Sequence, residues 1–459
     1  MQDLEKMIAD FRNIVSPKFC NELAKKSGLV KRSSSQLQGY EFAQALLIPN
    51  GFLGSETLNS LAVRMNKINN NCNLSAPALC QRMNSTMAVI FMKACFDKVL
   101  TTFVKKDFVS LGDLQNFSCF KRILIQDSTV IELQHGFSPG FKGYKGTSKS
   151  NLKIDYIFDY LSEQTVDLSI FSANQADQSL AARINFYLEK GDLVIRDLGY
   201  FAVERFKEIE AKCYHISRLK TDVNIYENMD DIEPIDLVEF FKKHSVKSLI
   251  DVKIFVGKEK HAMRLVASSI CKKTIAQKLK KAKRRSQRNG TAISEKKLNL
   301  LQFNICLTNV PKSMLSCSAI MVIYRARWRI ENIIKQWKSC LGVHIFNGYK
   351  EKSLECLIYG RLIVILLIHS ISTPLMQYAI TLNKELSCFK LFKYMVADNA
   401  FKKAFDEFKI AEFIKILLLD LPKRLCMDER KRYSLRKNVR TNTCFPKSKK
   451  MNNLSKKFA

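Results

Sequence analysis

The sequence lacks the features that would point to a zinc-binding or membrane protein. It holds only six histidines, and no two of them stand at the spacing of a zinc finger. Its 14 cysteines never come closer together than eight residues, so there is no Cys-x-x-Cys pair, which argues against a zinc ribbon. Scattered thiols of this kind are typical of reduced, buried side chains in a cytoplasmic protein.

Long hydrophobic runs and a secretory leader are also missing. The most apolar window, residues 362–368, holds seven apolar residues between Arg361 and His369, which is too short to span a bilayer. Asp3, Glu5 and Asp10 are wrong for the start of a signal peptide. We therefore expect no membrane segment and a cytoplasmic location.

Acidic residues are scarce beside basic ones. The chain of 459 residues has 75 Lys and Arg against 43 Asp and Glu, a formal net charge of +32. This excess is typical of proteins that bind nucleic acid, with an anionic membrane surface as the other partner to consider. A hydrophobic content of 47% excludes wholesale disorder, and the length indicates two to four domains.

Apolar patterning predicts helices at both ends of the chain and an α/β region between them. Residues 1–26, 58–65 and 75–83 have helical periodicity. The last two flank a polar turn, so either a helix-turn-helix with Gln81 and Arg82 exposed or a plain helical bundle is indicated. Strands are predicted at 123–126, 130–133, 152–160, 165–171, 193–196, 214–218, 246–256 and 303–308, with helices at 177–188, 201–210 and 272–288.

Two basic segments stand out from this background. Residues 272–288 hold nine Lys or Arg and no acid, so an anionic partner explains them better than a solvated face, because like charges on one helix repel each other. Beyond residue 345 the chain is predicted to form helices around an apolar segment at 353–380. The tail from Lys423 onward has thirteen basic residues and two acidic ones.

The segment from Tyr324 to Lys338 carries the most specific pattern. On one α-helix, Tyr324, Arg327, Glu331 and Lys338 would fall at roughly 0°, −60°, −20° and −40° around the axis. Such a stripe is a poor core face because three charges would need burial and pairing. It suits contact with a phosphodiester and a metal ion beside it, and a solvated helix face is the alternative.

Glu331 has two candidate partners at the ends of buried strands. Asp127 follows the predicted strand 123–126, and Asp197 follows the predicted strand 193–196. Ligand sites gather at strand ends of α/β sheets, and three such carboxylates suit two magnesium ions about 3.5–4 Å apart. We interpret the nearby acids Asp155, Asp159, Asp167 and Asp192 as structural.

These motifs together resemble a known family. Asp127-Ser-Thr, Asp197-Leu-Gly-Tyr200 and the spacing Tyr324-x2-Arg327-x3-Glu331-x6-Lys338 resemble the DDE transposases of bacterial insertion sequences, within them the large insertion-sequence-four family. The basic run Lys278 to Arg285 and the strand before Asn309-Val-Pro311 are similar to the insertion domain of that family. The resemblance covers roughly residues 55–345.

The resemblance implies an α/β fold with an RNase H-like catalytic core that is interrupted by a β-rich insertion and flanked by helical N-terminal and C-terminal domains. The implied division is a helical DNA-binding domain at 1–115, core at 116–218, basic insertion at 219–310, core with the signature helix at 311–345, and a helical region with a basic tail at 346–459.

The resemblance also implies roles for individual residues. Asp127, Asp197 and Glu331 would be the catalytic ligands of Mg²⁺, for which Mn²⁺ can substitute. Phe303 takes the place where the family commonly has a tryptophan that stacks on a flipped base, although a core residue of a strand is the plain alternative. The implied DNA contacts are Tyr324, Arg327, Lys338, Phe303, Lys280, Lys281, Arg284, Arg285, Gln81 and Arg82.

The implied function is that of a bacterial, nucleoid-associated transposase. It would cut the ends of an insertion sequence and join their 3′-hydroxyls to target DNA, as a homodimer in the DNA complex. The segment 353–380 would either supply a pairing surface or be buried within its own subunit. An inactive transposase-derived DNA-binding protein and an RNase H-like DNA nuclease are the alternatives.

Overall fold

The structure is a computed structural model with its secondary elements in chain order from α2 to β11. It describes residues 16–32, 36–47, 57–69, 72–104, 117, 119–133, 140–143, 150–244, 249–290, 292–342, 344–345, 350–382, 384–396 and 409–427. The predicted helical stripe at 1–26 is therefore described only from residue 16 onward, and most of the basic tail lies outside the described residues.

The helices are α2 (Pro17–Lys26), α3 (Gly39–Leu47), α4 (Leu58–Ile68), α5 (Ala76–Met83), α6 (Thr86–Val104), α7 (Asp177–Leu180), α8 (Val203–Glu210), α9 (Leu237–Lys243), α10 (Lys272–Asn289), α11 (Glu295–Leu300), α12 (Cys317–Tyr324), α13 (Arg327–Leu341), α14 (Glu351–Thr381), α15 (Cys388–Val396) and α17 (Ile410–Asp420). The short helices are η2 (Ala181–Phe186), η3 (Leu198–Tyr200) and η5 (Leu421–Leu425). The strands are β1 (Ile123–Glu132), β2 (Asn151–Asp159), β3 (Gln164–Ser172), β4 (Leu193–Arg196), β5 (Tyr214–Arg218), β6 (Ile225–Tyr226), β7 (Leu249–Val256), β8 (His261–Ser269), β9 (Phe303–Thr308), β10 (Glu385–Leu386) and β11 (Cys426–Met427).

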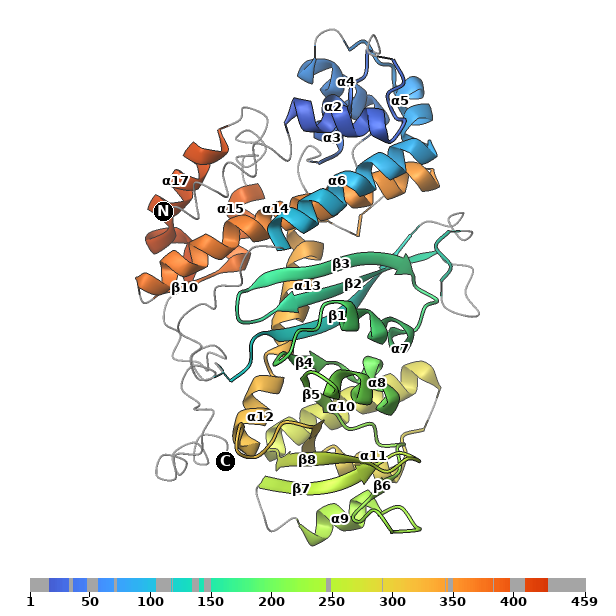
Figure 1. Cartoon of the computed structure of the whole chain (residues 1–459), viewed down its shortest axis with the longest axis vertical. Helices are drawn as coiled ribbons and strands as arrows, with labels where there is room; N and C mark the ends of the chain where they lie inside the picture. Colours follow the sequence, from blue (N-terminus) through green and yellow to red (C-terminus); the bar gives the residue numbers. More distant parts are fainter. Residues whose placement is uncertain are drawn as a thin grey trace.

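One mixed sheet of nine strands forms the centre of the molecule, in the order β3-β2-β1-β4-β5-β9-β8-β7-β6. Strands β1 to β3 are antiparallel neighbours, whereas β4 and β5 run parallel to β1. Figure 1 shows helices α2 to α5 beyond one side of this sheet and strands β7 and β8 with helix α9 at the opposite end. The predicted α/β class is confirmed.

Strand β9, the last strand of this sheet along the chain, joins the two parts of the sheet. It pairs antiparallel with β5 on one side and with β8 on the other. The segment predicted as an insertion, residues 219–310, therefore continues the sheet of the core instead of forming a separate one.

Short buried strands were predicted with the correct limits, and the long one was not. The predictions at 193–196, 214–218 and 303–308 coincide with β4, β5 and β9. The separate strands at 123–126 and 130–133 are wrong, because β1 is continuous. Strand β2 pairs with β1 from Leu124 to Glu132 and keeps the polar residues between the two apolar runs in the ladder.

The prediction of one continuous α-helix at 177–188 is also wrong. It consists of the four-residue α7 followed by the 3₁₀ helix η2. Two backbone carbonyls at their junction, those of Leu180 and Ala181, accept hydrogen bonds from the side chains of Gln126 and Arg196. Side-chain donors of this kind compete with the helical ladder, so the segment does not continue as an α-helix.

Hydrophobic layers cover both faces of the sheet. On one face, Ile125 and Tyr156 belong to the large core that includes α13 and α14. On the other face, Leu124, Val194 and Ile209 form a smaller cluster with the neighbouring residues of η2 and α8. Because neighbouring residues of β1 point to opposite faces, each strand is held from both sides.

Helix α14 is the central element of the helical part. It has 31 residues, lies beside α6 in Figure 1, and its residues Leu362 and Leu367 are fully buried. Of the two alternatives for the segment 353–380, the structure describes burial within its own subunit for most of the residues. Residues Glu351–Met376 have the length and composition of a membrane-crossing helix, but 89% of that window is buried in the protein, as in a core helix.

The N-terminal helices are positioned by caps and by one close approach to α14. Thr57 caps α4 and Ser75 caps α5, each by accepting a hydrogen bond from a backbone N–H in the first turn. Gly360 of α14 faces the backbone of α3, where an added Cβ would lie 2.5 Å from the carbonyl oxygen of Leu46. Only glycine allows these two helices to pack at this distance.

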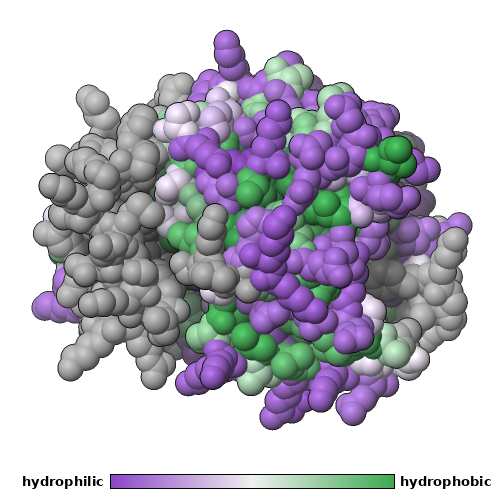
Figure 2. Space-filling model, turned by 90° about the horizontal axis from the view of Figure 1, so that it is seen from below, coloured by the Kyte–Doolittle hydropathy of each residue, from purple (hydrophilic) through white to green (hydrophobic). Residues whose placement is uncertain are grey.

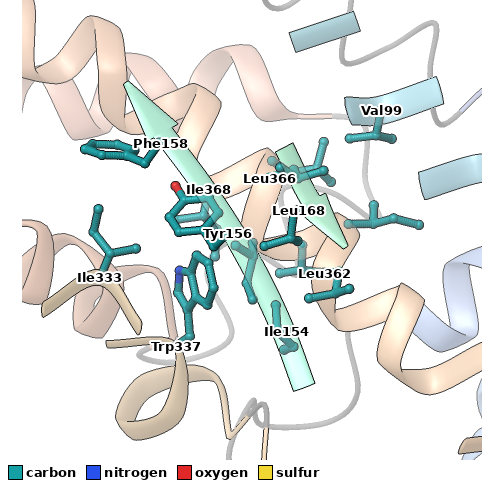
Figure 3. Packing of buried hydrophobic residues seen from close by; sticks show 14 of the residues in the cluster. Val99, Ile154, Tyr156, Phe158, Leu168, Ile333, Trp337, Leu362, Leu366 and Ile368 are labelled. Carbon is teal, nitrogen blue, oxygen red and sulfur yellow. The ribbon is translucent and has the colours of Figure 1, made fainter. Parts of the chain in front are cut away.

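A buried hydrogen bond joins α13 to α14 beneath the sheet. The indole Nε1 of Trp337 donates to Nε2 of His369 at 3.1 Å, and the rings of Trp337 and Tyr156 meet edge to face with centroids 4.7 Å apart. Figure 3 shows Trp337 and Tyr156 pointing toward one another in this core. Burial, and secondarily the charge of Arg329, lowers the pKa of His369 to about 3.

The burial of His369 predicts that the folded protein loses stability in acid. Since the pKa of His369 is about 3 when folded and near 6.5 when unfolded, the unfolded chain binds more protons between these values. We expect the free energy of unfolding to decrease as pH falls from 6.5 toward 3, by up to about 1.4 kcal/mol per pH unit. Urea denaturation of the wild type and His369→Gln at pH 7 and pH 5 measures this, with His244→Gln as the control. Equal pH dependence in all three proteins would contradict the assignment.

Candidate active site

The two predicted strand-end acids lie level with one another on adjacent strands. Strands β1 and β4 are parallel, and their last paired residues are Gln126 and Arg196. Asp127 and Asp197 each follow directly, so they occupy the next level at the carboxyl end of the parallel pair, where strands are about 4.8 Å apart. Asp127 is not at the end of its own strand, because β1 continues along β2 after β4 has ended.

The third acid, Glu331 of helix α13, is linked to Asp197 by Arg327 of the same helix. The Nη1 atom of Arg327 lies 2.6 Å from Oε1 of Glu331, and its Nε lies 3.8 Å from Oδ1 of Asp197. The side chain of Arg327 is 16% exposed, whereas that of Asp197 is 44% exposed. The guanidinium therefore lies between two carboxylates at the edge of a partly open site.

Asp127 has a largely buried carboxyl with a shifted pKa. Burial raises its pKa to about 7, against the lowering effects of Arg327 and of the Ser128 backbone N–H, which donates to Oδ1 at 2.9 Å. The charges of Asp197 and Glu331 raise the pKa of Asp127 further. All three carboxylates thus influence one another, and the site has negative charge that a cation would compensate.

The three acids fit a divalent cation by their chemistry but not by their present spacing. Carboxylate oxygens are the ligands that Mg²⁺ prefers. Within the described part of the chain, no three His, Cys, Asp or Glu side chains lie close enough to hold one ion. Between Asp197 and Glu331 the space is taken by Arg327, so its guanidinium stands where positive charge is needed.

The prediction that one helix carries Tyr324, Arg327, Glu331 and Lys338 is wrong for Tyr324. Tyr324 is the last residue of α12, and α13 begins at Arg327. Between them the backbone N–H groups of Arg325 and Ala326 bond to the carbonyls three residues earlier, so the chain makes a tight turn. Arg327, Glu331 and Lys338 share one helix, and Tyr324 approaches the site from another.

Tyr324 and Lys338 both contact the backbone of the strands that carry Asp127 and Asp197. The Tyr324 hydroxyl donates to the carbonyl of Arg196 at 3.4 Å, directly before Asp197, and burial raises the pKa of this phenol above its ordinary value. The ammonium group of Lys338 donates to the carbonyl of Val130 on β1 at 3.0 Å. In this structure the two side chains hold α12 and α13 against β4 and β1.

Comparison with known proteins identifies the family. A sequence profile for the family described as Transposase DDE domain matches residues 118–367, more than half of the chain. The chain belongs to this family. Its matched region includes all three acids of the site, and the predicted resemblance to the DDE transposases of bacterial insertion sequences is confirmed. The narrower assignment to the insertion-sequence-four family stays a prediction.

Several curated relatives of this DDE transposase are similar over most of their length. The chain is 26% identical over 426 residues to the transposase for insertion sequence element IS231F of Bacillus thuringiensis subsp. israelensis, covering 87% of each protein. It is 28% identical over 396 residues to that of IS231B of Bacillus thuringiensis subsp. berliner, covering 82% of each. It is 25% identical over 441 residues to that of IS1151 of Clostridium perfringens, covering 90% of this chain and 91% of the relative.

Among solved structures, the transposase is similar to a piggyBac transposase synaptic complex with hairpin DNA. The identity is 12% and the TM-score 0.39, over 93% of this chain and 87% of that one. This similarity is too slight to show that the two chains share a fold.

One cation of the transposase site was missed by sequence reasoning. The register of β4 with β5 pairs Ile195 with Ile216, so Arg218 stands level with Asp197 and extends the row formed by Asp127 and Asp197. The charge of Arg218 opposes the rise in the pKa of Tyr324 that burial causes, and it adds to the lowering of the pKa of Lys278 by burial, so Arg218 lies near both side chains. The signal was a cation at the end of a buried strand, but only the strand pairing places it beside the acids.

The basic helix α10 of the transposase divides into an anchor and an exposed face. Burial, and secondarily Arg218, lowers the pKa of Lys278 to about 8, and its ammonium donates to Oδ1 of Asn304 on β9 at 3.0 Å. Lys280, Lys281 and Arg284 are exposed. The backbone of Arg285 is helical, and its side chain lies outside the described atoms. Figure 2 views the end that carries β7 and α9, where hydrophilic side chains cover much of the surface.

Three other predicted DNA contacts lie apart from the acids. Phe303 is buried and stacks on Phe241, with ring centroids 4.7 Å apart, in the hydrophobic cluster of β7 to β9. The structure therefore describes the alternative in which Phe303 is a core residue of a strand. Gln81 is exposed and Arg82 half-buried on α5, which Figure 1 places at the far end of the molecule from α10.

The position of Arg218 predicts a role in holding the phosphate that reacts. We expect Arg218→Gln to slow cleavage of the DNA end by about ten- to a hundredfold, since a hydrogen bond to a charged group contributes about 1.5–3 kcal/mol. Arg205→Gln is the control, because it removes a half-exposed arginine that pairs with Glu208 on α8. Cleavage rates at saturating protein measure the effect. Equal cleavage rates for the two variants would show that Arg218 does not hold the reacting phosphate.

Proposed function

We propose that this transposase cuts DNA at the ends of its insertion sequence and joins the resulting 3′-hydroxyls to target DNA. The observation that carries this is the level placement of Asp127 and Asp197 on adjacent parallel strands, with Glu331 linked to them through Arg327. The strand order β3-β2-β1-β4-β5, with three antiparallel strands followed by two parallel ones, supports an RNase H-like core.

Asp127, Asp197 and Glu331 would hold the divalent cations, Mg²⁺ with Mn²⁺ as a substitute. Two such ions supply a nucleophile of lowered pKa, water or a 3′-hydroxyl, and stabilise the leaving oxygen. Asp127 contributes a buried carboxyl whose pKa is raised to about 7 in the free protein, and positive charge that arrives beside it favours the ionised form. Asp197 and Glu331 contribute more exposed carboxylates that need only lose their contact with Arg327.

Arg327 connects the arrival of DNA with the formation of this site. In the free protein its guanidinium compensates the charge of Asp197 and Glu331. A phosphodiester offers the same guanidinium a bidentate partner, which arginine binds strongly. When Arg327 turns to the phosphate, the two carboxylates become available for the cations, and Arg218 can bind a neighbouring phosphate oxygen.

The remaining cations extend the DNA-binding surface away from the acids. Lys280, Lys281 and Arg284 on the exposed face of α10, together with Arg285, would contact the backbone of the bound DNA. Lys338 would exchange its contact with the Val130 carbonyl for a phosphate. Gln81 and Arg82 on α5 would contact a different segment of the same DNA, because α5 lies at the other end of the molecule.

Separate substitutions in the acids and in α10 test this proposal. Asp127→Asn, Asp197→Asn and Glu331→Gln should each abolish cleavage and joining in Mg²⁺ and leave end binding nearly unchanged. The combined variant Lys280→Gln, Lys281→Gln and Arg284→Gln should instead weaken binding to any DNA and reduce the slope of log affinity against log salt by roughly 0.9 per lost contact.

Gel-shift and strand-transfer assays on linear DNA with inverted repeats measure both effects. Near-normal joining by Glu331→Gln would refute the assignment of the three acids as cation ligands. An unchanged salt slope in the combined α10 variant would show that α10 is a solvated helix that does not contact DNA. A wild type that binds without cutting would be an inactive derivative, and one that cuts without regard to the end sequence would be a nuclease.

We further propose that two copies act together, because two DNA ends must be joined to one target. Most of the segment 353–380 is covered by its own chain, so we place the interface elsewhere. We expect light scattering of the complex with end DNA to give a mass of two chains and two DNA ends. A complex that is competent for strand transfer and contains one chain would contradict this.

A further inference from the structure

A layer of buried polar side chains lies behind the candidate active site, on the opposite face of the sheet. Gln126 and Arg196 precede Asp127 and Asp197, and since side chains alternate along a strand, they point to the other face. Both reach the junction of α7 and η2. Gln126 Nε2 donates to the Leu180 carbonyl at 3.2 Å, and Arg196 Nη1 donates to the next carbonyl, Ala181, at 3.0 Å.

Asp155 is the carboxylate at the centre of this layer. It lies on β2, is fully buried, and accepts hydrogen bonds from three side chains. Gln126 Nε2 donates to it at 3.1 Å, the Tyr200 hydroxyl at 2.7 Å and Arg183 Nη1 at 2.9 Å. Asp155 therefore contacts one residue beside Asp127 and another on the turn that follows Asp197.

The connection of Asp155 to both strand ends distinguishes it from its neighbour Asp167. Asp167 is a second buried acid on β3 that pairs with the same arginine, Arg183. The contacts found for Asp167 are with Arg183, Ser169 and Tyr187, and they leave out Gln126 and Tyr200. The two acids are thus alike in burial and in ion pairing, and they differ in their contact with the strand ends.

Burial of such charges costs free energy and is poorly explained by stability alone. A buried ion pair is often no more stabilising than apolar residues of the same volume, whereas it fixes geometry because each partner has a defined direction. A carboxylate pair that binds metal depends on geometry, because small displacements of reacting groups carry a large cost in rate. A directional tie between the two strands meets that need.

We propose that Asp155 is a positioning residue that fixes the separation of Asp127 and Asp197 by holding Gln126 and Tyr200 from behind the sheet. The inference rests on the proposed role of the two acids as cation ligands. It revises the interpretation of Asp155 as an acid of purely structural value. Asp155 touches neither DNA nor cation, and it acts through the two residues that it binds.

The test compares Asp155→Asn with Asp167→Asn in the full-length protein bound to end DNA. Each variant weakens an ion pair with Arg183, so both should lower the melting temperature by a similar amount. The Mn²⁺ concentration that half-saturates the complex, measured from the EPR signal of the free ion, should rise about 10- to 100-fold in Asp155→Asn, as is usual for a residue that orients ligands. In Asp167→Asn it should change less than about twofold.

Two further variants keep the test decisive. Tyr200→Phe removes only the hydroxyl that binds Asp155, and it should raise the half-saturating Mn²⁺ concentration several-fold. Added to Asp155→Asn, it should raise that concentration no further than Asp155→Asn alone does. If Asp155→Asn does not fold, Tyr200→Phe alone decides, and unchanged Mn²⁺ binding in it would overturn the proposal. Equal changes in Asp155→Asn and Asp167→Asn would also overturn it.

Asp127→Asn separates this inference from the proposed function. If the Mn²⁺ binding of the wild type is insensitive to Asp127→Asn, the acids are not the ligands and the proposed function fails along with the inference. If Asp127→Asn abolishes binding and Asp155→Asn leaves it intact, the proposed function stands and the positioning role of Asp155 is refuted.

Discussion

The parallel pairing of β1 with β4 is the constraint on which the candidate site depends. It aligns Gln126 with Arg196, and every feature of the site follows from that alignment. The next residues on each strand are acids on one face, and the paired residues themselves bind a common junction on the other face. A slip of one residue would place Asp127 and Arg196 on the same face and separate the two carboxylates.

Charge is balanced on both faces of these strand ends. In front, Arg327 lies between Asp197 and Glu331, and behind, Arg183 lies between Asp155 and Asp167. The two arginines differ in what surrounds them. The partners of the front arginine, Asp197 and Glu331, are partly exposed, so a phosphate can replace them. The partners of the rear arginine, Asp155 and Asp167, are buried. One is suited to exchange partners and the other to keep them.

The sequence predicted those strands whose limits depend on neighbouring residues in the chain. Short apolar runs such as residues 193–196 form buried strands wherever they are placed, so their limits were correct. The continuity of β1 and the contact of Phe303 with Phe241 depend on partners distant in the chain. The two separate strands predicted in place of β1 were therefore wrong, and the sequence left two alternatives open for Phe303. The turn between α12 and α13 is local, but a helical stripe of residues does not reveal it. The acids were found by their order, while Arg218 required the register of β5, which no local pattern contains.

The return of β9 to the edge of β5 sets the order in which the chain can fold during synthesis. When β5 has left the ribosome, its outer edge has no partner until β9 follows roughly 85 residues later, a delay of about 4–17 s at ordinary rates of elongation. Glu331 and the covering helix α14 emerge later still. A nascent chain that ends before β9 therefore has an open strand edge and lacks Glu331 of the candidate site.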